Sequence, residues 1–267
     1  MTAPPIVGAA TAPVMAAGLD FQQLRMANLG RARRRLGGVV ITDSVWNASD
    51  WMLSASAQMG RASDLVLALR RGECGMADRR DPGRPELLVE VARGLGEVVI
   101  LLDLVAAYLA IDLVTAVTGK FNRVSERESF PERLGVDGLG FDDLRVTNLR
   151  RCRRWHQGRS LQEFPWTCAD WALAASGEMG ETANQVKKLR RIDSGAASRR
   201  DPLRDVVVGQ IADEMGDVVT YLDLLAAYLG IDLGSSVAMA FNDASEIEGF
   251  PEGLEATGPV MVTVEDR

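Results

Sequence analysis

The sequence predicts an all-α protein made of two tandem four-helix repeats. Two observations lead to this prediction. The second part of the chain repeats the first at an offset of 120 residues, and in both copies long stretches of strong helix formers are separated by proline and glycine. Four helices per copy are typical of a bundle, and two similar copies in one chain predict an intrachain pseudo-dimer.

The repeat keeps one register almost without gaps. Residues 79–82, 106–109, 121–122 and 130–132 recur as residues 199–202, 226–229, 241–242 and 250–252. Chance does not preserve one register over so long a stretch, so we infer a gene duplication followed by fusion. The chain then divides into a flexible N-terminal tail (1–18), a degenerate first repeat (19–136), a complete second repeat (137–257) and a C-terminal tail (258–267).

Four helices are predicted in the second repeat. They cover residues 141–155, 167–191, 205–229 and 233–244. Strong helix formers dominate these stretches, and Pro202 and Gly230 mark two of the breaks between them. Residues 38–42 and 260–264 could form short strands.

Composition and charge limit the classes of function. The formal net charge of −7 argues against broad nucleic-acid binding, although a local cationic pocket could still take a phosphorylated small molecule. Three cysteines without metal-ligand spacing favour a reduced, cytoplasmic protein. No apolar run approaches the roughly 20 residues that span a bilayer, and the start of the chain lacks the basic residues of a signal peptide, so no membrane partner is expected.

Two pairs of acidic residues are the strongest candidates for a functional site. Glu178 and Glu181 are spaced i, i+3 on one predicted helix, and Glu214 and Asp217 have the same spacing on the next. Each pair therefore lies on one helix face, and two antiparallel helices would bring all the carboxylates together. Oxygen ligands of this kind suit Mg²⁺.

The alternative is that these acidic residues simply face water. Helical phase argues against it, because Ile211 shares a face with Glu214, and Trp171 shares a face with Glu178. Carboxylates on apolar, inward-facing stripes are unfavourable without a compensating cation, and a bound metal would supply one.

The two acidic pairs and their flanking residues, 178–191 and 213–233, resemble the MazG-like and dimeric dUTPase group of all-α nucleotide pyrophosphatases. The resemblance implies hydrolysis of a nucleoside triphosphate to the monophosphate and pyrophosphate with Mg²⁺, for which Mn²⁺ may substitute. Glu178 or Glu181 would serve as the general base. Pyrimidine deoxynucleotides fit the resemblance, purine triphosphates remain open, and a homodimer of pseudo-dimers is one assembly that it allows.

The first repeat has lost most of the acidic pattern. Gln58, Arg61 and Gly94 stand at the positions of Glu178, Glu181 and Glu214, and only Glu97 remains, at the position of Asp217. Arg61 places a cation where a metal ligand is expected. We therefore expect this repeat to bind no catalytic metal.

The second repeat, which keeps the acidic residues, has instead lost cationic residues that the first repeat retains. The family pattern that the resemblance implies places Lys120, Asn122 and Arg127 of the first repeat near the phosphates. In the second repeat Asn242 is retained, but Lys120 and Arg127 are replaced by Ala240 and Ile247. One composite site could therefore draw carboxylates from one repeat and cations from the other; random drift in both repeats is the alternative.

Other substrate-binding candidates have competing interpretations. Lys187 and Lys188 could bind phosphate or lie in solvent, His156 could contact a base or ribose or end a helix, and Trp155 could stack on a base. Trp166 and Trp171 have counterparts in the first repeat, Trp46 and Trp51, so core packing is favoured for them. The arginine runs 31–35 and 150–154 occur in both repeats and favour a salt-bridged face over a substrate rim. Two other functions compete with the enzyme: a nucleotide-binding regulator without turnover, and a purely structural bundle.

Overall fold

The protein is all-α. The computed structural model describes residues 18–256 and 258–262, and within these residues it contains eight α-helices, one short 3-10 helix and no strand. The helices are α1 (Phe21–Arg35), α2 (Ala48–Glu73), α3 (Arg84–Tyr108), α4 (Leu113–Arg127), α5 (Phe141–Trp155), α6 (Cys168–Asp193), α7 (Arg204–Leu229) and α8 (Leu233–Glu248). We call α1–α4 the first half and α5–α8 the second half.

The helix predictions for residues 141–155, 167–191, 205–229 and 233–244 agree with α5–α8 to within a few residues. The two expected strands are wrong where the structure describes them. Residues 41–43 form the 3-10 helix, and Met261 makes only an isolated bridge with Ile231. Residues 263–264 and the expected N-terminal tail, apart from Gly18, lie outside the described residues.

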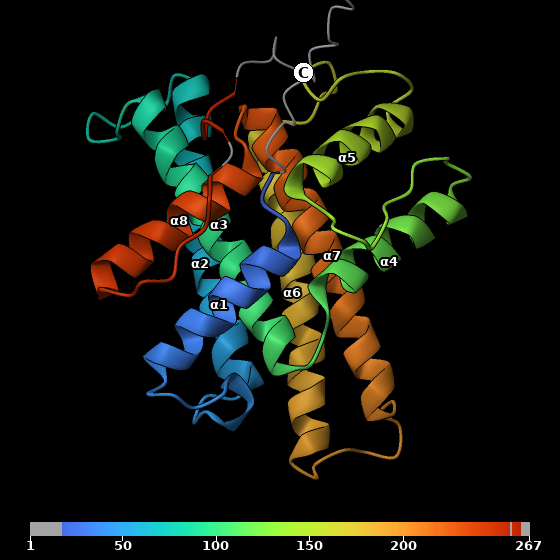
Figure 1. The fold of residues 1–267 in the computed structure, drawn as a ribbon. Coiled ribbons are helices and arrows are strands. Elements are labelled where there is room, and N and C mark those ends of the chain that lie inside the picture. The colour runs from blue at the N-terminus through green and yellow to red at the C-terminus, as the bar shows by residue number, and fades with distance from the viewer. Residues whose placement is uncertain (1–17, 257, 263–267) are drawn as a thin grey trace, which may run out of the picture.

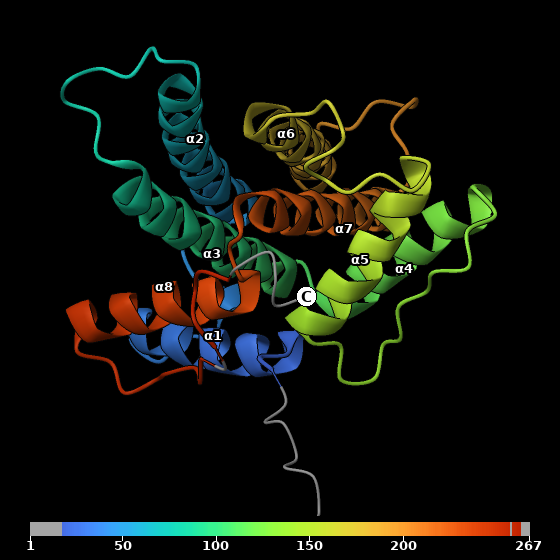
Figure 2. The same cartoon turned by 90° about the horizontal axis from the view of Figure 1, so that it is seen from above.

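The helices are arranged around two central pairs (Figures 1 and 2). The antiparallel pair α2 and α3 and the antiparallel pair α6 and α7 pack against each other, mainly through α2 and α6. In both views α8 and α1 lie beside α3 on one side, while α4 and α5 lie beside α7 on the other. Among the described helices, none alone is long and apolar enough to cross a membrane, although α3 and α4, bent by 102°, together meet that length and composition.

The fourth helix of each half packs on the opposite half. Helix α4 packs mainly on α7, and α8 packs mainly on α3, so the two halves do not form the separate four-helix bundles that the sequence suggested. Glycines allow this close approach. A Cβ atom added to Gly216 of α7 would lie 2.8 Å from the carbonyl oxygen of Ala116, and one on Gly96 of α3 would lie 2.3 Å from that of Ser236. The equivalent glycines therefore seat α4 and α8.

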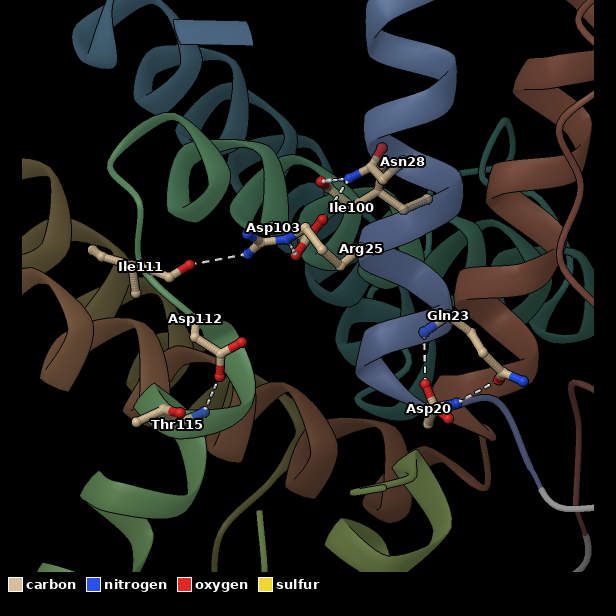
Figure 3. Close-up of polar contacts among 9 residues, drawn as sticks. All are labelled: Asp20, Gln23, Arg25, Asn28, Ile100, Asp103, Ile111, Asp112 and Thr115. Carbon is tan, nitrogen blue, oxygen red and sulfur yellow. Dashed lines mark hydrogen bonds and ion pairs between the residues drawn. The ribbon is translucent and has the colours of Figure 1, made fainter. Parts of the chain in front are cut away.

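A buried polar network fixes α1 to α3 (Figure 3). Arg25 donates from Nε to Asp103 at 2.7 Å, and Asn28 donates to the other carboxylate oxygen at 3.0 Å and to the carbonyl of Ile100 at 2.9 Å. The guanidinium of Arg25 also reaches the carbonyl of Ile111 at 3.2 Å, just before α4. Both carboxylate oxygens of Asp103 thus accept a hydrogen bond, whereas the buried Oδ1 of Asn28 has no partner among the described residues.

The same network recurs in the second half. Arg145 donates to Asp223 at 2.5 Å and to the carbonyl of Ile231 at 3.1 Å, and Asn148 donates to Asp223 at 2.9 Å. The network explains why this arginine, asparagine and aspartate recur at the repeat offset. It sets the direction in which the chain leaves the third helix of each half, and with it the start of the fourth helix.

Candidate functional site

Three carboxylates converge between α6 and α7. Glu178 of α6 and Glu214 and Asp217 of α7 each place a carboxylate oxygen within 4.8 Å of the others. The i, i+3 spacing puts the two α7 carboxylates on the face that packs on α6. Glu181, one turn further along α6, is exposed and lies outside this cluster. The structure thus brings together three of the four carboxylates that the sequence singled out.

The electrostatics of the cluster are unfavourable for three negative charges. Burial, and then the charges of Asp217, Glu181 and Glu214, raise the pKa of Glu178 to about 7. Burial also raises the pKa values of Glu214 and Asp217, against the opposing effect of Lys120. Raised pKa values mean that these clustered carboxylates are less stable in their charged form than carboxylates in water. A cation bound among them would therefore be favoured.

The nearest cation comes from the first half. The ammonium of Lys120, on α4, lies 2.7 Å from Asp217 and 3.9 Å from Glu214. Burial alone would lower the pKa of Lys120, but its hydrogen bond to Asp217 and the charges of Asp217 and Glu214 leave it raised. The structure therefore brings Lys120 to the carboxylates of the other half, as the reciprocal losses in the sequence suggested.

Two residues on other helices position Lys120. Gly216 leaves room for α4, because a Cβ atom there would lie 2.9 Å from the Cβ of Lys120. The guanidinium of Arg151, on α5, lies 3.4 Å from the centre of the Phe121 ring and donates to the carbonyl of Phe121 at 2.9 Å. Arg151 is buried and holds the residue next to Lys120 in place. Sequence analysis missed this role, although Arg151 and Phe121 both recur, as Arg31 and Phe241.

The equivalent position in the first half has another chemistry. Arg61 donates to the side-chain oxygen of Gln58 at 2.6 Å. Burial raises the pKa of Glu97, while Arg61 and Arg93 act to lower it. Gly94 stands where the second half has the carboxylate of Glu214. It packs closely on Ala62, because a Cβ atom added to Gly94 would lie 3.3 Å from the Cβ of Ala62. Side-chain cations thus balance the remaining carboxylate where the second half has a cluster of acidic groups.

Three of the expected phosphate-binding residues have partners elsewhere. Arg127 is exposed and pairs with Glu128 at 2.8 Å. The amide of Asn122 both donates to and accepts from the backbone of Leu134, at 2.9 and 2.8 Å, and Asn242 does the same with Leu254. These asparagines fasten the segment after each fourth helix, which accounts for their presence in both halves.

The other candidates lie on α6 and at the end of α5. Lys187 is exposed, and Lys188 donates to Gln185 at 3.1 Å. His156 stacks on Phe164, with ring centres 3.5 Å apart, and meets Trp171 edge-on at 6.2 Å. Trp155 is exposed and packs edge-on against Phe130.

The structure agrees with core packing for Trp166 and Trp171 and with a salt-bridged face for the two arginine runs. Trp171 is buried, with Trp166 packed against it at 4.6 Å. Arginines in the two runs make ion pairs: Arg34 with Glu252, Arg35 with Glu248, and Arg154 with Glu132.

Tyr221 is a further residue that sequence analysis did not single out as a site candidate. It is half-buried on α7, one turn after Asp217. Burial, and then the charges of Glu178 and Asp217, raise the pKa of its phenol. The first half has Leu101 at this position. A polar residue present only in the half with the acidic cluster was the signal that could have identified it.

The donor set fits a hard divalent cation. Clustered carboxylate oxygens are the ligands that Mg²⁺ prefers, and burial, followed by the charges of the neighbouring carboxylates, raises the pKa of Glu178 despite the nearby ammonium of Lys120. Comparison with protein-family models, with curated proteins and with solved structures finds no match.

Proposed function

We propose that this protein is a Mg²⁺-dependent nucleoside triphosphate pyrophosphohydrolase with one site built across its two halves. The observation that carries the proposal is the contact between Lys120 of α4 and the carboxylates of α7. A carboxylate cluster supplies metal ligands, and an adjacent ammonium supplies a phosphate contact. The resemblance to MazG-like pyrophosphatases in residues 178–191 and 213–233 gives this pairing its reaction class.

Each residue has a role in the proposed reaction. Glu178, Glu214 and Asp217 would hold Mg²⁺ or Mn²⁺, and the exposed Glu181 would complete the ligand set from the solvent side. When bound, the ion would neutralise phosphate oxygens of the substrate. Lys120 would bind the β- and γ-phosphates and stabilise the charge that develops on the leaving pyrophosphate.

Water would be the attacking group. Its oxygen forms a bond to the α-phosphorus, and the bond from that phosphorus to the pyrophosphate oxygen breaks. A carboxylate must accept the proton that water loses, and Glu178 is proposed for this role because it lies in the carboxylate cluster on α6. Glu181 is the alternative base.

The fold supports the same proposal through its repeated plan. We take the chain to be an intrachain pseudo-dimer in which the second half supplies the acidic helices and the first half supplies α4. The reaction proposed places the protein in the cytoplasm, where nucleoside triphosphates are abundant. A homodimer of such pseudo-dimers remains compatible with this arrangement.

Pyrophosphate release from a panel of ribo- and deoxyribonucleoside triphosphates tests the proposal directly. We expect at least one triphosphate to yield its monophosphate and pyrophosphate, and expect this only with Mg²⁺ or Mn²⁺. The matched variants are Asp217→Asn and Glu97→Gln, which remove equivalent carboxylates from the two halves. Turnover that survives Asp217→Asn, or no turnover of any triphosphate, would refute the proposal.

A nucleotide-binding regulator is the second candidate, and one observation favours it. The ammonium of Lys120 lies 2.7 Å from Asp217, at the edge of the cluster, where it could hold a phosphate of a nucleotide that is bound but not hydrolysed. A regulator would be stabilised against heat by a triphosphate but would release no pyrophosphate. The same panel, read by thermal unfolding as well as by product, separates the two functions.

A further inference from the structure

Each fourth helix makes an arginine–aspartate ion pair with the opposite half, and the charges are reversed between the two interfaces. Arg123 of α4 pairs with Asp213 of α7, and Arg93 of α3 pairs with Asp243 of α8. At the repeat offset, position 93 corresponds to 213, and position 123 corresponds to 243. The same two positions therefore meet at both interfaces, but the arginine is on the fourth helix at one interface and on the third helix at the other.

We infer that this charge reversal directs the fourth helix of each half to an unlike half, as within this chain, and excludes the like half of a second copy. If two copies paired first half with first half, α4 of one copy would lie on α3 of the other, and Arg123 would meet Arg93. If they paired second half with second half, Asp243 would meet Asp213. Pairing of unlike halves, as within this chain, opposes unlike charges at both interfaces.

Apart from the ion pairs of Lys120 with Asp217 and Glu214, which among the described residues only the α4–α7 interface has, the two interfaces are closely alike. Gly216 and Gly96 seat the fourth helices in the same way. Arg151 lies over Phe121, and Arg31 lies over Phe241 at nearly the same distance, 3.4 and 3.6 Å. Neither contact distinguishes α4 from α8. Interfaces this similar permit exchange of equivalent helices between copies of a chain.

The magnitudes are consistent with a role in choosing partners. All four side chains are at least a third exposed, with 34% for Arg93, 36% for Asp243, 54% for Arg123 and 41% for Asp213. Exposed pairs add little net stability, but opposing like charges penalises the wrong partner as well as forfeiting the pair. The pairing of α4 with α7 is also the one that carries Lys120 to Asp217.

Two charge-exchange variants of the full chain test the inference. Arg93→Asp with Asp243→Arg keeps both native ion pairs but places aspartate on each third helix and arginine on each fourth helix, so pairing of like halves becomes allowed. Adding Arg123→Asp and Asp213→Arg reverses the other interface too. This quadruple variant again forbids pairing of like halves and serves as the matched control.

Interchain pairing can be measured by refolding two preparations of one variant together, labelled with donor and acceptor dyes, and recording energy transfer and mass by light scattering. Mixing the same preparations after refolding separates exchanged helices from ordinary association. We expect the double variant to give at least about fivefold more co-refolding product than the parent, and the quadruple variant to return to the parent's level.

Equal product from the double variant and the parent would overturn the inference, and so would a quadruple variant that stays as high as the double. The reciprocal double variant, Arg123→Asp with Asp213→Arg, removes the same discrimination at the other interface, so the test does not depend on one variant folding. Melting temperatures near that of the parent are expected throughout, because every variant keeps an ion pair at both interfaces, and the exposed contact of Arg93 with Glu90, at 3.9 Å, adds little stability.

Discussion

The ammonium of Lys120 lies 2.7 Å from the carboxylate of Asp217, although the two residues belong to different halves of a duplicated sequence. Helix α4 crosses to α7 to make this contact. The candidate site is therefore a property of the whole chain, and substitutions in the half without the acidic cluster should affect it.

Lys120→Met should lower kcat/KM for the triphosphate by roughly tenfold to a hundredfold, the effect of losing one charge-assisted hydrogen bond. Affinity for Mg²⁺ should not fall, since the variant removes a cation that competes for Asp217 and Glu214. Arg127→Met is the control, because Arg127 is exposed and paired with Glu128. Steady-state kinetics and calorimetric titration of Mg²⁺ measure both effects; an Arg127 effect as deep as that of Lys120 would contradict this assignment.

Asp217→Asn should abolish turnover and weaken Mg²⁺ binding, because it removes a ligand charge with little change in volume. Glu97→Gln makes the same change at the equivalent position in the first half, where Gln58 and Arg61 replace two of the other carboxylates. That variant should keep its rate within a few-fold of the parent. A single-turnover assay with each variant decides it, and equal losses would mean that both halves hold metal.

Arg151→Met should lower kcat through Lys120, because Arg151 holds the backbone of Phe121 beside that lysine. Arg31→Met removes the same type of contact from Phe241 and serves as the stability-matched control. A merely structural role would lower the melting temperature in both variants and the rate in neither. In the Lys120→Met background, Arg151→Met should have little further effect on the rate. Additive losses would show that Arg151 does not act through Lys120.

Glu178 should make the metal-free protein less stable as pH rises. Its folded-state pKa of about 7 lies above the ordinary value of 4.5, so the folded protein holds more protons than the unfolded chain between these pH values. The free energy of unfolding therefore falls across this window: the contribution is complete below about pH 4.5 and is lost above about pH 7. Because the side chain is half-exposed, solvent screening should reduce the effect to about 1 kcal/mol.

Denaturant unfolding in a metal chelator at pH 5 and pH 8 measures this contribution. The parent should lose more stability than Glu178→Gln between the two pH values, and Mg²⁺ should oppose the loss at pH 8, where the carboxylate is ionised. The same pH dependence in both proteins would show that Glu178 does not titrate in this range.

Much of the helical plan could be predicted from sequence because its signals are local. The prolines and glycines that end helices mark the boundaries of α5–α8 to within a few residues. The apolar stretches at 38–42 and 260–264 misled the prediction, because apolar residues alone do not supply a partner strand. The exchange of α4 and α8 is a relation between distant segments, which helical periodicity does not encode.

The candidate site, too, has features that the sequence predicted and others that it did not. The i, i+3 spacing of Glu214 and Asp217 predicted that they share a face, and the reciprocal losses predicted that Lys120 would cross to them. Spacing did not reveal that Asn122 binds the backbone of Leu134, or that Arg151 anchors Phe121. Those contacts depend on loop paths and on helix packing across the two halves.

The packing of α8 on α3 also bears on how the chain is made. Gly96 packs against the backbone of Ser236, which the ribosome adds roughly 140 residues later. At ordinary elongation rates the delay between the two residues is about 7–28 s. Throughout that interval the groove on α3 has been synthesised but its covering helix has not. The nascent chain therefore leaves the apolar residues of α3 that pack on α8 uncovered until α8 itself has been synthesised.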